Sequence, residues 1–192
     1  MDGPDKKNEL EKRKYEWLNE NCPPYGQSNH GEKYIKFLQS ANFESLLDVG
    51  TGKGQMCYEV SKRYKKVYGL DWGIKPDESC KNANIEFINA DAQSIPLPDN
   101  SVDVTTSFDF LEHVIPENID KVISEIARVT KSWLLNTIGT GPSKSRRKQL
   151  EEIFGDGELH QTQKSKEWWI KVLSKHGETL EFADGGLLTL IS

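Results

Sequence analysis

The residues best suited to chemistry in the first third of this chain are an aspartate and three glycines in the stretch LLDVGTGKGQ, residues 46–55. Asp48 precedes the turn, and Gly50, Gly52 and Gly54 follow at alternate positions. Because glycine has no Cβ, a turn of this kind lets the backbone approach a bound nucleotide closely. The stretch therefore predicts a nucleotide site, and the spacing of the glycines indicates which nucleotide it holds.

Two phosphate-binding patterns do not fit this turn. A P-loop requires G-x-x-x-x-G-K-[S/T], but Leu47 occupies the first glycine position and Gly54 replaces the hydroxyl residue that binds magnesium. A dinucleotide turn requires G-x-G-x-x-G, and here Gln55 stands where the third glycine belongs. S-adenosylmethionine has no phosphate and carries an ammonium group, which suits Asp48 better than a pyrophosphate does. The turn therefore favours S-adenosylmethionine.

Further polar residues follow the next two apolar runs. Asp71 ends the run KVYGLD, where a carboxylate can hold the two hydroxyls of a ribose. Asp91 and Ala92 follow the run NIEFINA, where the carboxylate could accept from an adenine amino group and the backbone N–H could donate to the ring. Trp72 stands beside the ribose carboxylate, and its ring could either wall the adenine or pack in the core.

Four segments together resemble the class I S-adenosylmethionine-dependent methyltransferases, in their compact small-molecule form (methyltransferase type 11-like). These segments are LLDVGTGKGQ, GLDW, NADAQSIPLPDNSVDVTTSFDFLEHV and EIARVTK, and the similarity extends from Leu46 to about Ile138. The resemblance implies S-adenosylmethionine as the cofactor and places the backbone of Phe108 and Asp109 near its methionine part. The predicted cofactor-binding residues are Asp48, Gly50, Thr51, Gly52, Gly54, Gln55, Asp71, Trp72, Asp91, Ala92, Phe108 and Asp109.

Three histidines are the predicted catalytic residues, because imidazole titrates near neutral pH and can serve as a general base. The stretch FLEHV offers Glu112 and His113 just beyond the fourth predicted strand. His30 and His160 stand in loops that could border the cleft. A base is required only where the acceptor must lose a proton. No cluster with the spacing of metal ligands is visible in the sequence, and we assign none.

These residues need a scaffold of alternating strands and helices to bring them together. The apolar runs SLLDVG, KVYGLD, NIEFINA, VDVTTSFD and SWLLNTI predict buried parallel strands, with helices over residues 55–64 and 118–130 between them. The residues around Asp184-Gly185-Gly186 predict a hairpin after a helix that carries Trp168 and Trp169. The fold class is α/β: Rossmann-like, doubly wound, with a mostly parallel seven-stranded sheet that ends in an antiparallel β-hairpin.

One domain accounts for the whole of residues 1–192. We expect a helical cap over residues 1–40, a cofactor-binding core over 41–140, and acceptor-side helices with the C-terminal hairpin over 141–192. The cap follows from a charged helical stretch over residues 5–21, which the breaker-rich segment NCPPYGQSNHG ends.

Composition indicates a cytoplasmic protein with a small-molecule partner. The net charge of −5 argues against a surface built mainly for nucleic acid, and no apolar run approaches the roughly 20 residues of a membrane helix. The three widely spaced cysteines suggest neither a disulfide framework nor a zinc site, and a reducing compartment explains them most simply.

The predicted function is methyl transfer from S-adenosylmethionine to a small acceptor, with a sugar or another hydroxylated metabolite favoured. The basic run KSRRK, residues 144–148, leaves open an RNA or protein methyltransferase, and a solvated helix face is its plainer interpretation. A non-catalytic cofactor-binding or scaffolding module also stays open, because fold does not fix function. The segment NCPPYG resembles the N-P-P-Y motif of adenine amino-methylating enzymes, but Cys22 interrupts it and it precedes the glycine turn.

Overall fold

A seven-stranded sheet forms the middle layer of the computed structural model, which describes residues 3–27, 31–144 and 146–192. The strand order is β3-β2-β1-β4-β5-β7-β6; β1 to β5 are parallel, and β7 runs antiparallel to both of its neighbours. The order reverses between β1 and β4, which is where such sheets bind ligands at their carboxyl ends. The strands are β1 (Ser45–Val49), β2 (Lys66–Asp71), β3 (Ile85–Asn89), β4 (Val102–Phe108), β5 (Thr130–Thr137), β6 (Gly177–Glu181) and β7 (Leu187–Ile191).

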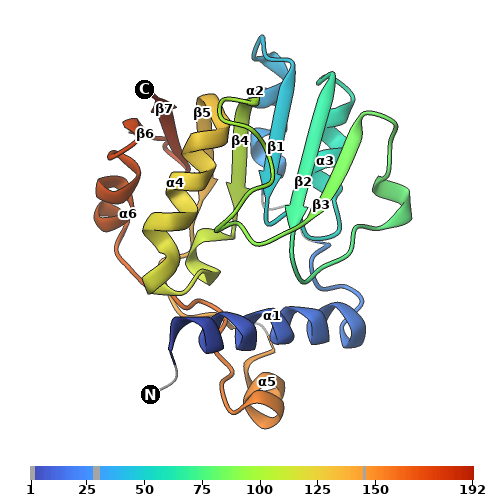
Figure 1. The fold of residues 1–192 in the computed structure, drawn as a ribbon, viewed down its shortest axis with the longest axis vertical. Helices are drawn as coiled ribbons and strands as arrows, with labels where there is room; N and C mark the ends of the chain where they lie inside the picture. The colour runs from blue at the N-terminus through green and yellow to red at the C-terminus, as the bar shows by residue number, and fades with distance from the viewer. Residues whose placement is uncertain (1–2, 28–30, 145) are drawn as a thin grey trace.

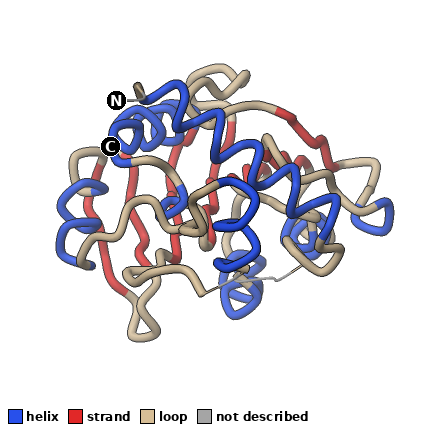
Figure 2. Tube along the Cα trace, turned by 90° about the horizontal axis from the view of Figure 1, so that it is seen from below, coloured by secondary structure: helices blue, strands red, loops and turns tan. Residues whose placement is uncertain are grey.

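Helices cover both faces of the sheet, which is why its strands are continuous apolar runs rather than alternating ones. On β1, Leu46 packs into the core on one face and Leu47 into the core on the other, and both side chains are fully buried. Figure 2 shows the strands between the two helical layers. The helices are α2 (Ile35–Ser40) and α3 (Gln55–Ser61) on the Leu46 face, and α4 (Ile119–Val129) and α6 (Lys166–Leu173) on the Leu47 face.

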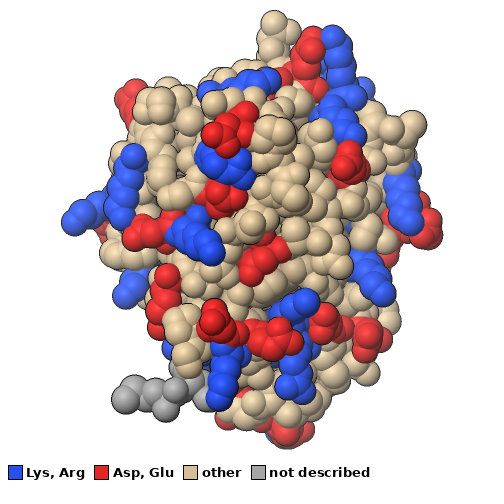
Figure 3. Space-filling model, in the orientation of Figure 1, with Lys and Arg blue, Asp and Glu red and all other residues tan. Residues whose placement is uncertain are grey.

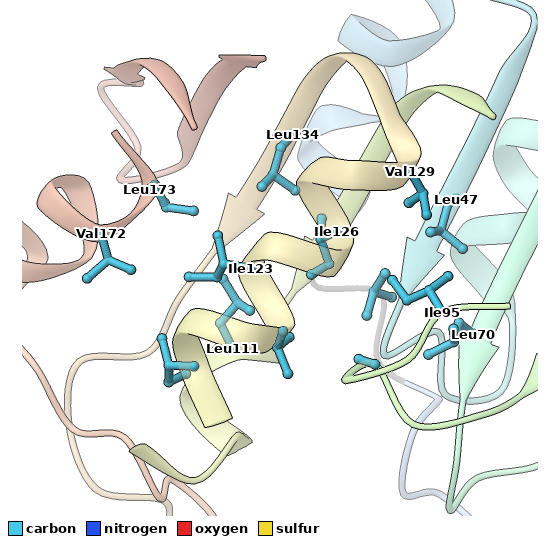
Figure 4. Close-up of a cluster of buried hydrophobic side chains, with 14 of the residues drawn as sticks. Leu47, Leu70, Ile95, Leu111, Ile123, Ile126, Val129, Leu134, Val172 and Leu173 are labelled. Atoms are coloured by element: carbon cyan, nitrogen blue, oxygen red, sulfur yellow. The ribbon is translucent and has the colours of Figure 1, made fainter. Parts of the chain in front are cut away.

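The larger core lies beneath α4. Figure 4 shows Ile123 and Ile126 on this helix pointing toward the strands that carry Leu134 and Leu47. Apolar residues recur along α4 at the three- and four-residue spacing of a helix with one buried face, so its docking follows directly from its sequence. Trp169 of α6 belongs to the same core and has no exposed surface, so this tryptophan packs α6 against the sheet.

The carboxyl end of the sheet is covered by the N-terminal helix α1 (Pro4–Asn21), which lies across the lower edge of the strands in Figure 1. Helix α5 (Arg147–Phe154) lies beneath it, and a separate apolar cluster of Leu18, Cys22, Leu150 and Leu159 joins the two. The described residues also form four 3₁₀ turns: η1 (Glu32–Tyr34), η2 (Glu78–Cys80), η3 (Leu111–His113) and η4 (Pro116–Asn118).

The predicted fold class is confirmed, including the antiparallel hairpin of β6 and β7. The helix predicted over residues 55–64 is shorter and ends at Ser61. A turn follows it and carries the Tyr64 hydroxyl to the Leu38 carbonyl, to which it donates at 3.0 Å. The basic run at 144–148 only partly forms a helix, because α5 begins at Arg147. Among the described helices, none is long and apolar enough to cross a membrane.

Candidate active site

A cavity of about 630 Å³ lies at the carboxyl ends of the strands, below the reversal point between β1 and β4 and against α1. We call its two parts the cofactor half and the acceptor half. The cofactor half is lined by Asp48, Gly50, Thr51, Gly52, Gln55, Asp71, Trp72, Asp91 and Ala92. The acceptor half is lined by Glu11, Tyr15, Tyr25, Asp109, His113 and His160.

The glycine turn forms one wall of the cofactor half and is held by the neighbouring strand. The N–H groups of Gly50 and Thr51 donate to the Leu70 carbonyl at 2.8 and 3.1 Å. Gly50 and Gly52 have φ values of +77° and +55°, in the left-handed region that favours glycine. A Cβ on Gly52 would lie 2.8 Å from the Gly26 carbonyl oxygen, so this position also needs glycine for space.

Asp71 is held by the backbone of the segments around it. Its Oδ2 accepts from the Gly52 N–H at 3.1 Å, and its Oδ1 accepts from the N–H groups of Gly73 and Ile74 at 3.0 and 2.9 Å. Burial raises the pKa of Asp71, and the N–H bonds counteract that rise. A carboxylate fixed in this way keeps lone pairs for the two hydroxyls of a ribose.

Asp48 is a buried carboxylate without a cation beside it. Its side chain is buried, its Oδ1 accepts from the Thr106 hydroxyl at 2.7 Å, and no lysine or arginine in the described ranges pairs with it. Burial raises the pKa of Asp48 to about 6. Because a positive charge nearby would favour its ionised form, this position fits the ammonium group of S-adenosylmethionine.

Asp91 and Gln55 lie farther along the same half. Asp91 accepts from the Gln93 N–H at 2.9 Å and from the Asn8 amide of α1 at 3.0 Å, so α1 is tied to this end of the cavity. Beside the turn, the buried Oε1 of Gln55 has no hydrogen-bond partner among the described residues. A buried acceptor of this kind fits a ligand that carries N–H or O–H donors, as S-adenosylmethionine does.

The structure gathers almost all of the predicted cofactor-binding residues into this cavity. Phe108 and Asp109 line it where the two halves meet, together with the residues of the cofactor half. Gly54 is the exception among the described residues, because it does not line the cavity. It opens α3 in the left-handed conformation, with φ of +91°, and packs against Phe87. Its role is to start the helix.

Two of the three predicted catalytic histidines meet in the acceptor half. The ring centroids of His113 and His160 lie 4.8 Å apart in an edge-to-face arrangement. Nδ1 of His160 donates to the Gly141 carbonyl at 2.6 Å, while Nδ1 of His113 lies 3.0 Å from the Leu159 carbonyl oxygen and 2.7 Å from the Tyr15 hydroxyl. His30 lies outside the described residues.

Glu112 lies directly behind the histidines and is completely buried. Its Oε1 accepts a hydrogen bond from the Gly139 N–H, and its Oε2 meets no donor of ordinary hydrogen-bond geometry in the described structure. Burial, with the negative charge of Asp109 beside it, raises the pKa of Glu112 to about 8. The stretch FLEHV already showed this glutamate, but nothing in the sequence indicated that β5 and the loop after it would cover it.

Helix α1 contributes residues that the sequence did not single out. Glu11 and Tyr15 line the acceptor half, and the buried Lys14 fixes Glu11 with a 2.8 Å contact to its Oε1. Lys14 also reaches Asp156 at 2.9 Å and the Glu158 carbonyl at 3.0 Å. Burial raises the pKa of Glu11 to about 7. Because the helix is rich in charge throughout, its sequence gave no signal for which charged residues would turn inward.

Comparison with known proteins shows a similarity over the central part of the chain. Residues 47–133 match the family model of a methyltransferase domain. The chain is 35% identical over 126 residues to the ubiquinone biosynthesis O-methyltransferase of Saccharophagus degradans, covering 55% of this chain and 53% of that protein. It is 26% identical over 139 residues to the malonyl-[acyl-carrier protein] O-methyltransferase of Serratia marcescens, covering 70% and 53%. The chain thus spans about half the length of these curated relatives.

A solved structure extends the similarity of the fold to the whole chain. The 1,6-didemethyltoxoflavin-N1-methyltransferase of Burkholderia thailandensis, solved with its substrate and S-adenosylhomocysteine, superposes with a TM-score of 0.76. The match covers 100% of this chain and 92% of that one at 11% identity. At this identity the similarity concerns the fold, and it includes α1 and the C-terminal hairpin.

Proposed function

We propose that the chain is a class I S-adenosylmethionine-dependent methyltransferase and that it transfers a methyl group to a small hydroxylated acceptor. S-adenosylmethionine supplies a methyl group that its positive sulfur already makes reactive. The protein then has two tasks, which are to hold the acceptor atom close and aligned and, where the acceptor carries a proton, to take it.

The cofactor half supplies the contacts that the cofactor needs. Asp48 would hold the ammonium group, Asp71 the ribose hydroxyls, and Asp91 with the Ala92 N–H the adenine. Gln55 offers its amide oxygen to a further donor. The main support for this assignment is that these carboxylates line one wall of a single cavity with no cation paired to Asp48 in the described structure.

The acceptor half supports a hydroxylated acceptor. Carboxylates and imidazoles surround it, and these groups accept hydrogen bonds from hydroxyls and can take their protons. In this proposal His113 and His160 face the acceptor oxygen, and Asp109 lies between the two halves. The relatives differ in their acceptor atom: the two named above are O-methyltransferases, whereas the solved neighbour is an N1-methyltransferase, so the choice of oxygen depends on the groups of the site. Within this class a sugar or a similar polyol remains our preferred acceptor.

The size and charge of the site favour a small molecule over an RNA or a protein. One cavity of about 630 Å³ must hold cofactor and acceptor together, with α1 across its edge. On the face that Figure 3 shows, Lys and Arg side chains are interspersed with Asp and Glu, without the single-sign surface that binds nucleic acid. In the basic run, Lys144 and Arg146 line the cavity, and Arg147 pairs with Glu158 at 2.9 Å.

We also propose a cytoplasmic location. Cys22, Cys57 and Cys80 are all free and buried, as is usual where thiols stay reduced. Expression of a tagged full-length chain followed by fractionation would test this.

The first test is calorimetric titration with S-adenosylmethionine, and with NAD for comparison. We expect Asp71→Asn to weaken S-adenosylmethionine binding roughly 30-fold, because it removes about 2 kcal/mol of charged hydrogen bonds to the ribose. Asp77→Asn is the matched control, since Asp77 follows on the same loop and does not line the cavity in the described structure. Equal binding by wild type and Asp71→Asn would contradict the cofactor assignment.

The second test concerns the acceptor. Formation of S-adenosylhomocysteine is measured with sugars, other hydroxylated metabolites, total RNA and protein extract. Turnover with a member of the first two groups supports the proposal. Turnover only with RNA or protein would replace it, and cofactor binding without turnover on any acceptor would indicate a non-catalytic module.

A further inference from the structure

We propose that Asp109, Glu112, His113 and His160 form a binding site for a divalent transition-metal ion. Each residue offers one ligand atom, and the four atoms lie within 4.8 Å of one another. Ligands on opposite sides of an ion of this kind are separated by about 4.2 Å, since each bond is about 2.1 Å long. The four atoms therefore need only a small inward shift to surround one ion. The sequence did not predict this site, because its ligands come from two segments 47 positions apart along the chain, from 113 to 160.

The second observation that points to a ligand is the state of Glu112. This side chain has no exposed surface, its Oε2 meets no donor of ordinary hydrogen-bond geometry in the described structure, and the Asp109 carboxyl group lies beside it. Its Oε1 is fixed by the Gly139 N–H, so the carboxylate cannot turn freely to find one. A buried, fixed carboxylate oxygen is costly unless a donor or a cation meets it. A metal ion among the four residues would meet this need.

The backbone holds the neighbouring carboxylate in an uncommon conformation. Asp109 has φ of +54°, in the left-handed region, and its N–H donates to the Thr137 carbonyl at 2.9 Å. Such a conformation costs free energy in a residue other than glycine, and it often occurs at functional sites. Here it places the Asp109 carboxylate at the end of β4, within the cluster.

The histidines are oriented as metal-binding histidines are. A ligating imidazole commonly donates the N–H of its other nitrogen to a backbone carbonyl, which fixes the ring and its tautomer. Nδ1 of His160 donates to Gly141 at 2.6 Å, and Nδ1 of His113 lies 3.0 Å from the Leu159 carbonyl oxygen. For His160 the proton lies on Nδ1, so the basic nitrogen of its ring is Nε2, and the Gly141 carbonyl holds the ring from the opposite side. The Leu159 carbonyl and the Tyr15 hydroxyl fix the ring of His113 at its Nδ1.

The donor set indicates the kind of ion. Two imidazoles suit Zn²⁺, Fe²⁺ or Mn²⁺, whereas Mg²⁺ and Ca²⁺ prefer sites made entirely of oxygen. Asp109, His113 and His160 line the cavity, while Glu112 lies behind them, so one side of the ion would face the acceptor half. An ion there would bind a hydroxyl of the acceptor and lower its pKa. This role rests on the proposed function, but binding of the metal does not.

The test uses Mn²⁺ alone, with neither cofactor nor acceptor present. The full chain is treated with a chelator, desalted and titrated at neutral pH, and electron paramagnetic resonance measures the free Mn²⁺. We expect one site per chain, displaced by Zn²⁺ and not by equal Mg²⁺. His160→Gln and Glu112→Gln should each weaken binding at least about tenfold. His160→Gln is the safer of the two for folding, because His160 lies in a partly exposed loop.

Two control variants match these changes away from the site. His176→Gln alters a histidine after α6, and Glu117→Gln alters an exposed glutamate paired with Lys7. Both should bind Mn²⁺ as the wild type does. Absence of a site in the wild type, or unchanged affinity in a folded His160→Gln, would overturn the proposal. Because the cofactor titration above involves no metal, failure of either proposal can be told from failure of the other.

Discussion

The two halves of the cavity are built in different ways. The cofactor half depends on backbone groups of neighbouring segments, such as the three N–H groups that hold Asp71 and the turn at residues 50–54. The acceptor half depends on side chains from α1, η3 and the loop that carries His160. A site made of backbone within one turn is fixed as soon as the strands pair. A site made of side chains from distant segments is fixed only when the whole chain has folded.

The halves also differ in how far their carboxylates are satisfied without a ligand. Asp71 and Asp91 each accept several hydrogen bonds from the protein. In the acceptor half, Glu11 and Glu112 each have one oxygen that meets no donor of ordinary hydrogen-bond geometry in the described structure, and burial raises their pKa values to about 7 and about 8. Asp48 is an intermediate case, with a pKa near 6. The cofactor half is thus largely preformed, whereas the buried carboxyl groups of the acceptor half still require a hydrogen-bond donor or a cation.

The largest effect is expected from a change in the backbone of the cofactor half. Gly52→Ala forces a side chain into φ of +55° and places its Cβ 2.8 Å from the Gly26 carbonyl oxygen. We expect it to lower the free energy of unfolding by about 2–4 kcal/mol and to weaken S-adenosylmethionine binding at least tenfold. Urea unfolding and calorimetric titration measure the two effects.

Gly141→Ala is the matched control for that change. A Cβ at Gly141 would meet nothing within 4 Å, so its free energy of unfolding should change by less than about 0.5 kcal/mol. If Gly52→Ala proved as mild as this control, the cofactor half would not depend on its backbone conformation, and the contrast between the halves would fail.

A smaller effect is expected from Glu112 and depends on pH. Burial raises its pKa from 4.5 to about 8, so the folded chain holds this proton more tightly than the unfolded chain does. The resulting stabilisation is complete below about pH 4.5 and is lost as the pH rises through about 8. Between these limits Glu112→Gln should abolish most of the loss of stability that the wild type shows as the pH rises, measured by urea unfolding with a chelator present.

Glu117→Gln serves as the control here. Because this carboxylate is exposed, removing it should leave the dependence of the free energy of unfolding on pH as it is in the wild type. A Glu112→Gln profile as steep as that of the wild type would show that the buried carboxylate is already satisfied. The acceptor half would then be as complete without a ligand as the cofactor half.

The same contrast explains how much the sequence could predict. The parallel strands and the hairpin were predictable, because apolar runs define the strands, and the residues predicted to bind the cofactor nearly all line the cavity, because the glycine turn is local. Gly54 does not line it, because this third glycine starts α3.

The acceptor half could be predicted only in part. Its histidines were recognised by their chemistry. The proximity of His113 and His160, however, depends on how the loop before α6 packs against η3. Glu11 and Tyr15 were not recognised, because the contacts of Lys14 with residues 156 and 158 decide which face of α1 turns inward. Such contacts between distant segments leave no periodic pattern in the chain.

The smallest effect is expected from Tyr15→Phe. This change tests, through turnover and cofactor affinity, whether α1 belongs to the acceptor half. The Tyr15 hydroxyl lies 2.7 Å from Nδ1 of His113, and the ring keeps its edge contact with that histidine when the hydroxyl is removed. Loss of about 1 kcal/mol of hydrogen bonding should lower turnover roughly fivefold and leave the affinity for S-adenosylmethionine within about twofold. Tyr64→Phe is the control, because its hydroxyl bonds to the Leu38 carbonyl and neither residue lines the cavity in the described structure, so it should lower stability without affecting turnover. If Tyr15→Phe instead weakened cofactor binding and spared turnover, α1 would belong to the cofactor half, where Asn8 already meets Asp91, and the boundary between the halves would have to move.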